Sequence, residues 1–210
     1  MVLPIKRFDL AKRRLEQELA GTLRATLAEA MAGDVLEALG QLERVEATVV
    51  VSRDPRALAL AQEHEALVVD DPSDANHSGA ARLGVALALA IGYERALLVP
   101  GDCPLLAPRE LDALLERHAP GAGVTIVPDR HGTGTNALLL SPPDAIEPSF
   151  GPGSAGRHQG LAAVAGVSAV IERVPSLELD VDTPEDLAAL RALLSGASRG
   201  ARTRAVLERR

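Results

Sequence analysis

The sequence predicts an α/β fold in which a mixed, mainly parallel sheet is covered by helices on both faces. Short, nearly continuous apolar segments alternate with longer segments of helical periodicity. Strands that are buried on both faces are apolar throughout, and the helices that connect parallel strands cover those faces. Hydrophobic residues make up 47% of the chain but aromatic residues only 1%, so the core must consist of Leu, Val, Ile and Ala.

The strands and helices follow one another along the whole chain. Eight segments are expected to be strands: residues 2–5, 47–52, 67–70, 95–100, 124–128, 136–141, 169–174 and 177–181. Six are expected to be helices: residues 15–39, 55–64, 78–91, 108–118, 154–165 and 184–194. Pro55, Pro108 and Pro184 stand where a first helical turn begins, which suits their fixed φ. The last two strands succeed each other around Pro175 without a helix between them, which favours a mixed sheet.

The length of 210 residues suits one compact domain, which we expect to span residues 1–194. Residues 195–210 are rich in Gly, Ser, Ala and Arg, so we expect a loosely ordered tail there. Only three residues precede Pro4, which implies either a short first strand or a start further upstream.

The charge and the cysteine content narrow the possible partners. A net charge of −7 argues against a general nucleic-acid surface. We expect no membrane partner, because no segment is long and apolar enough to cross a bilayer. Cys103 is the single cysteine, so no internal disulfide can form and a cytoplasmic location is expected. Cys103 is expected to be a packed small residue rather than a nucleophile.

Ligands of parallel α/β sheets bind beyond the carboxyl ends of the strands, so the loops that follow strands are the candidate sites. The first such loop contains the only lysines, Lys6 and Lys12, with Arg13 and Arg14. These side chains suit a triphosphate, although a solvated basic helix start would also explain them.

The loop after residues 67–70 opens a helix. Gly79 at the helix N-terminus could offer a backbone N–H to an anion, and Asn76 could read the edge of a purine. An ordinary helix cap and turn explains both residues equally well.

Acidic residues follow two separate strands. Asp102 comes just after the apolar strand 95–100, where a carboxylate can hold Mg²⁺ against a nucleotide phosphate. Asp180 and Asp182 point to the same side of an extended segment, and either could be a second metal ligand. Each acid also has a simpler explanation. Asp102 could cap a turn, and Asp180 and Asp182 could be surface acids that precede a helix capped by Thr183.

Two glycine-rich stretches are the remaining candidate binding loops. Residues 129–136 combine two glycines and two threonines before a strand, which suits close backbone approach or a hairpin turn. Residues 150–158 open a helix at Ser154 and could cradle a carboxylate or phosphate, with Arg157 adding a contact. A simple helix start is the alternative.

Four motifs together resemble the 2-phospho-L-lactate guanylyltransferase family, whose bacterial members include phosphoenolpyruvate guanylyltransferases. They are Val-Pro-Gly-Asp-Cys-Pro, Gly-Thr-Gly-Thr-Asn-Ala-Leu, Phe-Gly-Pro-Gly-Ser and Asp-Val-Asp-Thr-Pro-Glu-Asp-Leu. The resemblance runs from the first residues to about Leu194. It implies a three-layer, GT-A-like nucleotidyltransferase fold and a role in making coenzyme F-420, with GTP and a small phosphorylated carboxylic acid as substrates.

The resemblance also implies roles for particular residues. Asp102 and Asp182 match the metal positions, with Asp180 a close alternative. The acceptor-binding residues implied are Thr135, Gly151 and Ser154, with Asn136 as a neighbouring candidate. The nucleotide-binding residues expected are Pro4, Lys6, Lys12, Arg13, Asn76, Gly79 and Asp102, although Arg13 stands where a small Ser is common.

We therefore expect a guanylyltransferase that uses Mg²⁺, with Asp102, Lys6 and Lys12 as catalytic residues. The acceptor is either phosphoenolpyruvate or 2-phospho-L-lactate, and the protein either a monomer or a homodimer. Two other functions stay open, a nucleotidyltransferase of molybdenum-cofactor maturation and a non-catalytic nucleotide-binding module. Metal-dependent release of pyrophosphate from GTP would separate an enzyme from a binding module.

Overall fold

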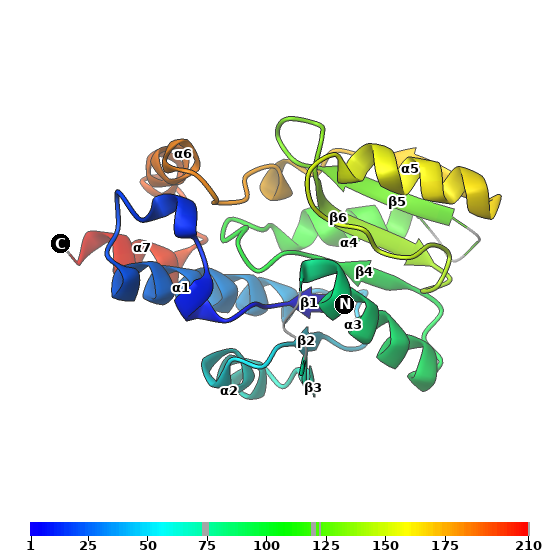
Figure 1. The fold of residues 1–210 in the computed structure, drawn as a ribbon, viewed down its shortest axis with the longest axis horizontal. Coiled ribbons are helices and arrows are strands. Elements are labelled where there is room, and N and C mark those ends of the chain that lie inside the picture. Colours follow the sequence, from blue (N-terminus) through cyan, green and yellow to red (C-terminus); the bar gives the residue numbers. More distant parts are fainter. Residues whose placement is uncertain (73–75, 119–120, 122, 210) are drawn as a thin grey trace.

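The described part of the chain forms a seven-stranded sheet with the strand order β3-β2-β1-β4-β6-β5-β7 (Figure 1). The computed structural model describes residues 1–72, 76–118, 121 and 123–209. The strands are β1 (Val2–Pro4), β2 (Val49–Val51), β3 (Leu67–Val69), β4 (Ala96–Leu98), β5 (Gly123–Pro128), β6 (Thr135–Ser141) and β7 (Ser168–Ile171). Strand β6 pairs antiparallel with both β4 and β5, whereas the other neighbours pair in parallel. The sheet is therefore mixed and mainly parallel, as predicted.

Helices cover both faces of the sheet. They are α1 (Gly21–Leu39), α2 (Pro55–Glu63), α3 (His77–Ile91), α4 (Pro108–Arg117), α5 (Ser154–Ala165), α6 (Pro184–Leu194) and α7 (Ala201–Glu208). Short 3₁₀ helices occur as η1 (Phe8–Leu10), η2 (Arg13–Leu15) and η3 (Pro175–Leu177). One apolar core joins the sheet to α1, α2, α4 and α6, and a second joins it to α3 and α5. Because neighbouring strand residues face opposite sides, Val2 lies in the second core and Leu3 in the first.

Helix α3 approaches strand β1 closely at Gly84. A Cβ atom at this position would lie 2.2 Å from Cγ1 of Val2, so only a glycine fits without displacing the strand. This contact fixes the strand from which the first loop emerges.

No helix in the described ranges is long and apolar enough to cross a membrane.

Two expectations about the C-terminal part are corrected. The strand predicted at residues 177–181 is absent; the chain instead forms η3 and then runs without regular structure, with the backbone N–H of Val181 donating to the carbonyl of Asp102. Pro175 begins the 3₁₀ turn and so ends the extended run.

The tail after Ser195 also differs from the loosely ordered segment expected there. Helix α7 packs against α1, and its residue Thr203 is fully buried. The carboxylate of Asp34 in α1 accepts hydrogen bonds from the backbone N–H groups of Arg202 and Thr203, each at 2.9 Å. An acidic side chain thus caps the first turn of α7, a tertiary contact that composition cannot reveal.

Candidate active site

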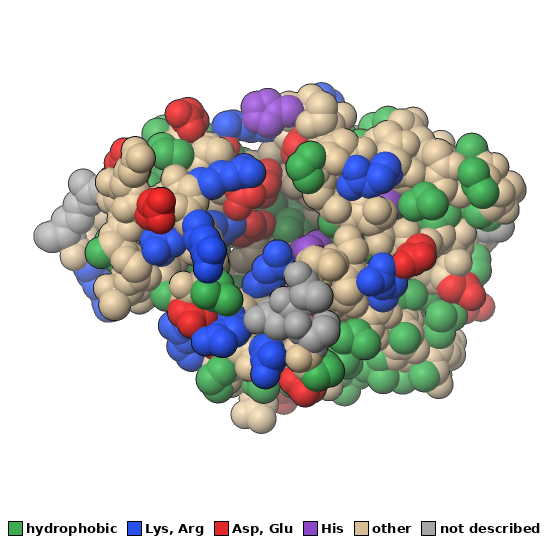
Figure 2. Space-filling model, in the orientation of Figure 1, with side chains coloured by type: hydrophobic (Ala, Val, Ile, Leu, Met, Phe, Trp, Pro, Cys, Tyr) green, Lys and Arg blue, Asp and Glu red, His purple; other side chains and the backbone are tan. Residues whose placement is uncertain are grey.

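A cavity of about 600 Å³ opens at the carboxyl ends of strands β1 and β4. Its wall consists of the loops that follow these strands, the β5–β6 loop, the glycine-rich loop before α5 and residues 180–186. Figure 2 shows this hollow in the surface, with Lys and Arg side chains along its rim and acidic side chains within it. A cavity with cationic edges and carboxylates inside suits a phosphate-bearing ligand held together with a cation.

Lys12 connects the two acidic segments at the centre of the cavity wall. Its Nζ donates to Oδ2 of Asp102 and, at 2.9 Å, to Oδ1 of Asp182. The Lys12 side chain is only 7% exposed, and its backbone has a φ of 55°, in the left-handed region. Burial opposes the charged amine, but the two carboxylates outweigh it and raise the pKa of Lys12. The sequence predicted Lys12 beside a triphosphate; the structure brings it onto the two acids.

The two carboxylates have the properties of cation ligands. Burial opposes the charge of Asp182, but Lys12 holds the pKa of this carboxyl below its usual value. Oδ1 of Asp102 is buried and has no hydrogen-bond partner in the described part of the chain. A buried anionic oxygen without a partner is costly unless a ligand or cation satisfies it. The pair therefore fits a divalent cation, although the described residues contain no cluster of three or more metal-ligating side chains.

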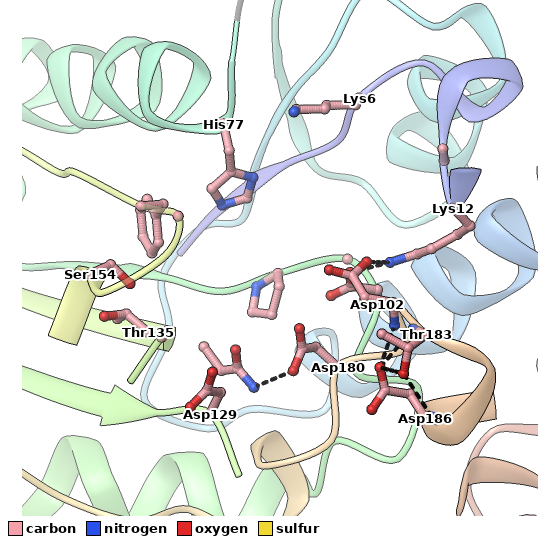
Figure 3. Close-up of a pocket in the computed structure, with 18 of the residues that line it drawn as sticks. Lys6, Lys12, His77, Asp102, Asp129, Thr135, Ser154, Asp180, Thr183 and Asp186 are labelled. Atoms are coloured by element: carbon pink, nitrogen blue, oxygen red, sulfur yellow. Dashed lines mark hydrogen bonds and ion pairs between the residues drawn. The ribbon is translucent and has the colours of Figure 1, made fainter. Parts of the chain in front are cut away.

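Asp180 lies close to Asp102 but has a different hydrogen-bond partner. Nδ2 of Asn136 donates to Oδ1 of Asp180 at 3.2 Å and to the carbonyl of Leu177 at 2.6 Å. Figure 3 shows Asp180 below Asp102 in the cavity. Burial and the nearby charge of Asp102 raise the pKa of Asp180 to about 6. The two candidates for the second metal ligand thus have different partners: Asp182 shares Lys12 with Asp102, whereas Asp180 accepts a hydrogen bond from Asn136.

The nucleotide-side residues are only partly assembled as expected. Pro4, Lys6 and Arg14 line the cavity, whereas Arg13 is not among the described residues that line it. Figure 3 shows Lys6 and His77 on the same side of the cavity, above the carboxylates.

The residues predicted at the start of α3 have a capping geometry. Oδ1 of Asn76 accepts a hydrogen bond from the N–H of Gly79 at 2.8 Å, as the helix cap of the alternative interpretation requires. The cavity wall, as far as the structure describes it, includes neither residue and instead includes His77, which the sequence reasoning missed. Burial lowers the pKa of His77 to about 4, so this ring is neutral near pH 7.

The acceptor-side residues do come together. Thr135, Gly151 and Ser154 all line the cavity, opposite the carboxylates (Figure 3). Ser154 is 1% exposed, and its Oγ is buried without a partner in the described residues. Gly151 has a φ of 110° and Gly153 a φ of 71°, conformations that favour glycine in the turn before α5. An orphan hydroxyl at the end of a glycine turn suits an anionic ligand.

Arg157 supports this turn from outside. Its guanidinium donates to the carbonyls of Pro152 at 2.6 Å, Ser149 at 3.0 Å and Phe150 at 3.2 Å. The sequence pattern favoured an anion contact for Arg157, but in the structure its guanidinium binds carbonyls of the loop. Cys103 is fully buried, which agrees with the packed residue expected there, and burial raises the pKa of its thiol.

Comparison with known proteins finds guanylyl transferases as relatives. The family model described as "Guanylyl transferase CofC like" matches residues 1–207. The phosphoenolpyruvate guanylyltransferase of Conexibacter woesei is 48% identical over 201 residues, which cover 95% of this chain and 90% of that protein. The protein of the same name from Sphaerobacter thermophilus is 41% identical over 186 residues, 89% of each chain.

The fold has a solved counterpart at low sequence identity. A putative nucleotide-diphospho-sugar transferase from Desulfovibrio desulfuricans superposes with a TM-score of 0.74 at 15% identity, covering 94% of this chain and 87% of that one. This likeness confirms the predicted α/β, GT-A-like nucleotidyltransferase fold.

Proposed function

The chain belongs to the family of CofC-like guanylyl transferases, and from this premise we propose that it transfers GMP from GTP to phosphoenolpyruvate. It is an enzyme of the nucleotidyltransferase class. One observation supports the proposal: the same cavity is lined by an acid pair, Asp102 and Asp182, and by the hydroxyl-bearing residues Thr135 and Ser154. This arrangement suits two anionic substrates that meet between a cation and a set of hydrogen-bond donors.

The proposed reaction is an attack by a phosphate oxygen of phosphoenolpyruvate on the α-phosphorus of GTP. A new P–O bond joins the two molecules, and the bond from the α-phosphorus to the bridging oxygen breaks, so that pyrophosphate leaves with the electron pair. The attacking phosphate is ionised at neutral pH, so no base has to remove a proton. Repulsion between two polyanions is the main obstacle, and catalysis consists of positioning and charge neutralisation.

The cationic side chains of the first loop neutralise the triphosphate in this scheme. Lys6, Lys12 and Arg14 all line the cavity, and each can place a positive charge against phosphate oxygens. The hydroxyls of Thr135 and Ser154 and the backbone at Gly151 hold the acceptor on the opposite side. We expect Asn76 and Gly79 to contribute by ordering the start of α3 rather than by direct contact.

We propose Mg²⁺ as the cation, held by Asp102 and Asp182. When bound, the ion would neutralise charge on the α-phosphate and on the departing pyrophosphate. Asp182 is preferred to Asp180 as the second ligand, because Lys12 already contacts the carboxylates of Asp102 and Asp182 together.

The name shared by the two relatives favours phosphoenolpyruvate over 2-phospho-L-lactate as the acceptor. The product would then be enolpyruvyl-2-diphospho-5'-guanosine. On the family resemblance, we propose that this product enters the biosynthesis of coenzyme F-420.

A pyrophosphate-release assay tests the proposal. The purified protein is mixed with Mg²⁺, one of GTP, ATP or CTP, and either phosphoenolpyruvate or 2-phospho-L-lactate, and the coupled product is identified by mass spectrometry. The highest kcat/KM is expected for GTP with phosphoenolpyruvate. A preference for CTP or ATP, or for 2-phospho-L-lactate, would replace that part of the assignment, and no pyrophosphate with any pair would refute it.

A further inference from the structure

His158 lies behind the acceptor side of the cavity, in the first turns of α5, and is fully buried. One ring nitrogen, Nε2, is 2.9 Å from the backbone N of Ser149, in the loop before α5. The other, Nδ1, is 3.0 Å from Oγ1 of Thr135, at the start of β6. The imidazole thus bridges the glycine-rich loop and the strand that carries a cavity-lining hydroxyl.

The direction of both hydrogen bonds follows from the chemistry of the groups. A backbone N–H can only donate, so Nε2 of His158 must be the unprotonated nitrogen of a neutral ring. The ring proton is then on Nδ1, which donates to Oγ1 of Thr135. Since that oxygen accepts from His158, its own hydrogen is free to point elsewhere. Thr135 lines the cavity, and His158 is its side-chain hydrogen-bond partner among the described residues.

We propose that His158 is a positioning residue that fixes the Thr135 hydroxyl as a hydrogen-bond donor directed at the anionic acceptor. The same ring fixes the position of the loop that carries Gly151, through the N–H of Ser149. This inference rests on the proposed function, because it assumes that the acceptor binds beside Thr135.

The surroundings of His158 keep its ring neutral and in place. Burial, and secondarily the charge of Arg157, lowers the pKa of His158 to about 4, so the ring stays unprotonated near neutral pH. The ring of Phe150 makes a T-shaped contact with the His158 ring, with the centroids 5.4 Å apart, and a second T-shaped contact with the ring of His77 at 4.7 Å. A ring that is clamped in this way cannot rotate to exchange its two nitrogens without disturbing the loop.

Three substitutions separate the two hydrogen bonds of His158. An Asn side chain places an N–H₂ donor near the position of Nδ1 but does not reach the N–H of Ser149. A Gln side chain places a carbonyl acceptor near the position of Nε2 but offers no donor to Thr135. A Phe side chain keeps the packing and removes both bonds.

The expected pattern concerns the KM for phosphoenolpyruvate. His158→Phe and His158→Gln should raise it on the order of tenfold, the usual effect of one misoriented buried hydrogen bond, whereas His158→Asn should stay within about threefold of the wild type. The KM for GTP should change less than about twofold in all three, since among the described residues the hydrogen-bond partners of His158 are Thr135 and Ser149, and neither is a proposed nucleotide-binding residue. A purely structural role would instead change both KM values and the Tm together.

A double variant that combines Thr135→Val with His158→Phe tests whether His158 acts on the KM for phosphoenolpyruvate through the Thr135 hydroxyl. The Thr135→Val variant lacks the hydroxyl, so adding His158→Phe to it should raise the KM for phosphoenolpyruvate clearly less than the same change does in the wild-type background. Equal effects in both backgrounds would mean that His158 does not act through Thr135.

The tautomer can be measured without any activity. A long-range ¹H–¹⁵N correlation spectrum of the wild-type protein should show a protonated Nδ1 and an unprotonated Nε2 for His158. The opposite tautomer, wild-type KM values in all three variants, or rescue by Gln but not by Asn would overturn the inference. If the wild-type protein has the expected tautomer but is inactive with phosphoenolpyruvate, the proposed function is wrong and the inference about His158 is not. The KM values of the wild type and the variants would then be compared with the acid that the protein does use.

Discussion

Replacing Lys12 with Met separates two roles that its position combines. In the structure, the Lys12 ammonium contacts both carboxylates that we propose as cation ligands. A divalent cation that binds Asp102 and Asp182 must therefore displace this ammonium or share the carboxylates with it. Lys12→Met removes the competing charge with a side chain of similar length, so we expect it to strengthen metal binding in the absence of nucleotide and yet to slow turnover.

The size of the effect follows from the geometry. Two unit charges about 4 Å apart interact with about 1 kcal/mol in water and about 4 kcal/mol in a partly buried setting. The Asp182 side chain is 50% exposed and that of Asp102 is 24% exposed, so the lower part of this range applies. Removal of Lys12 should therefore favour the metal by about 1–2 kcal/mol, which corresponds to a Kd roughly five- to thirtyfold lower.

The assay is a titration of nucleotide-free protein with Mn²⁺ or Mg²⁺ by calorimetry. Lys6→Met is the matched control, because Lys6 lines the same cavity but forms no ion pair with either carboxylate in the described residues. It should change the metal Kd less than about twofold, although both variants should lower kcat by weakening contacts to the triphosphate. Unchanged or weaker metal binding in Lys12→Met would refute the idea that the ammonium occupies the cation position.

Three further outcomes are expected. Asp102→Asn should lower kcat at least about a hundredfold while the Tm moves by only a few degrees, because a neutral amide oxygen is a much weaker ligand for a divalent cation than a carboxylate; near wild-type turnover would rule out the metal assignment. Gly84→Ala should lower the free energy of unfolding by about 1–3 kcal/mol in urea titrations, since its Cβ would lie 2.2 Å from Val2, whereas Gly160→Ala in α5, where nothing lies within 4 Å, should raise it by about 0.5–1 kcal/mol. If both alanines had the same effect, the close approach of α3 to β1 would be disproved. Because the pKa of His158 is lowered to about 4 in the folded protein, its contribution to stability is full above its unfolded pKa and is lost as the pH falls through the window between the two values. Between about pH 7 and pH 5 the wild type should lose about 2 kcal/mol more than His158→Phe, as measured by urea unfolding at each pH; parallel losses would contradict the lowered pKa.

The regular elements were predictable because their signals are local. A run such as Val49–Val51 buries every residue, and Pro55, Pro108 and Pro184 do begin helices. The prediction was wrong at residues 177–181, where the local sequence is compatible with a strand but also with a turn and irregular structure. These residues have the composition of a strand, but the chain forms η3 at this point, and Val181 then hydrogen-bonds to Asp102 in the loop after β4.

The candidate site shows the same division. Residue types in the loops pointed to Lys12, Asp102 and Asp182, and the family resemblance implied Thr135 and Ser154 as acceptor-binding residues. All five line the cavity. The roles of His77 and His158 were not predictable. A single histidine has no distinctive spacing, and its meaning depends on which groups the fold places against its two nitrogens.

By itself, the sequence determined the alternation of strands and helices, the acid that follows β4 and the glycines that permit the turn before α5. These are properties of short segments, set by side-chain period, by backbone conformation and by the ends of strands. Only the tertiary structure decided that Lys12 meets Asp102, 90 positions away, and Asp182, 170 positions away, and that His158 lies within hydrogen-bond distance of the Thr135 hydroxyl. Such contacts arise when the sheet and its two helical layers bring distant loops to one edge, and no local pattern encodes which side chains then meet.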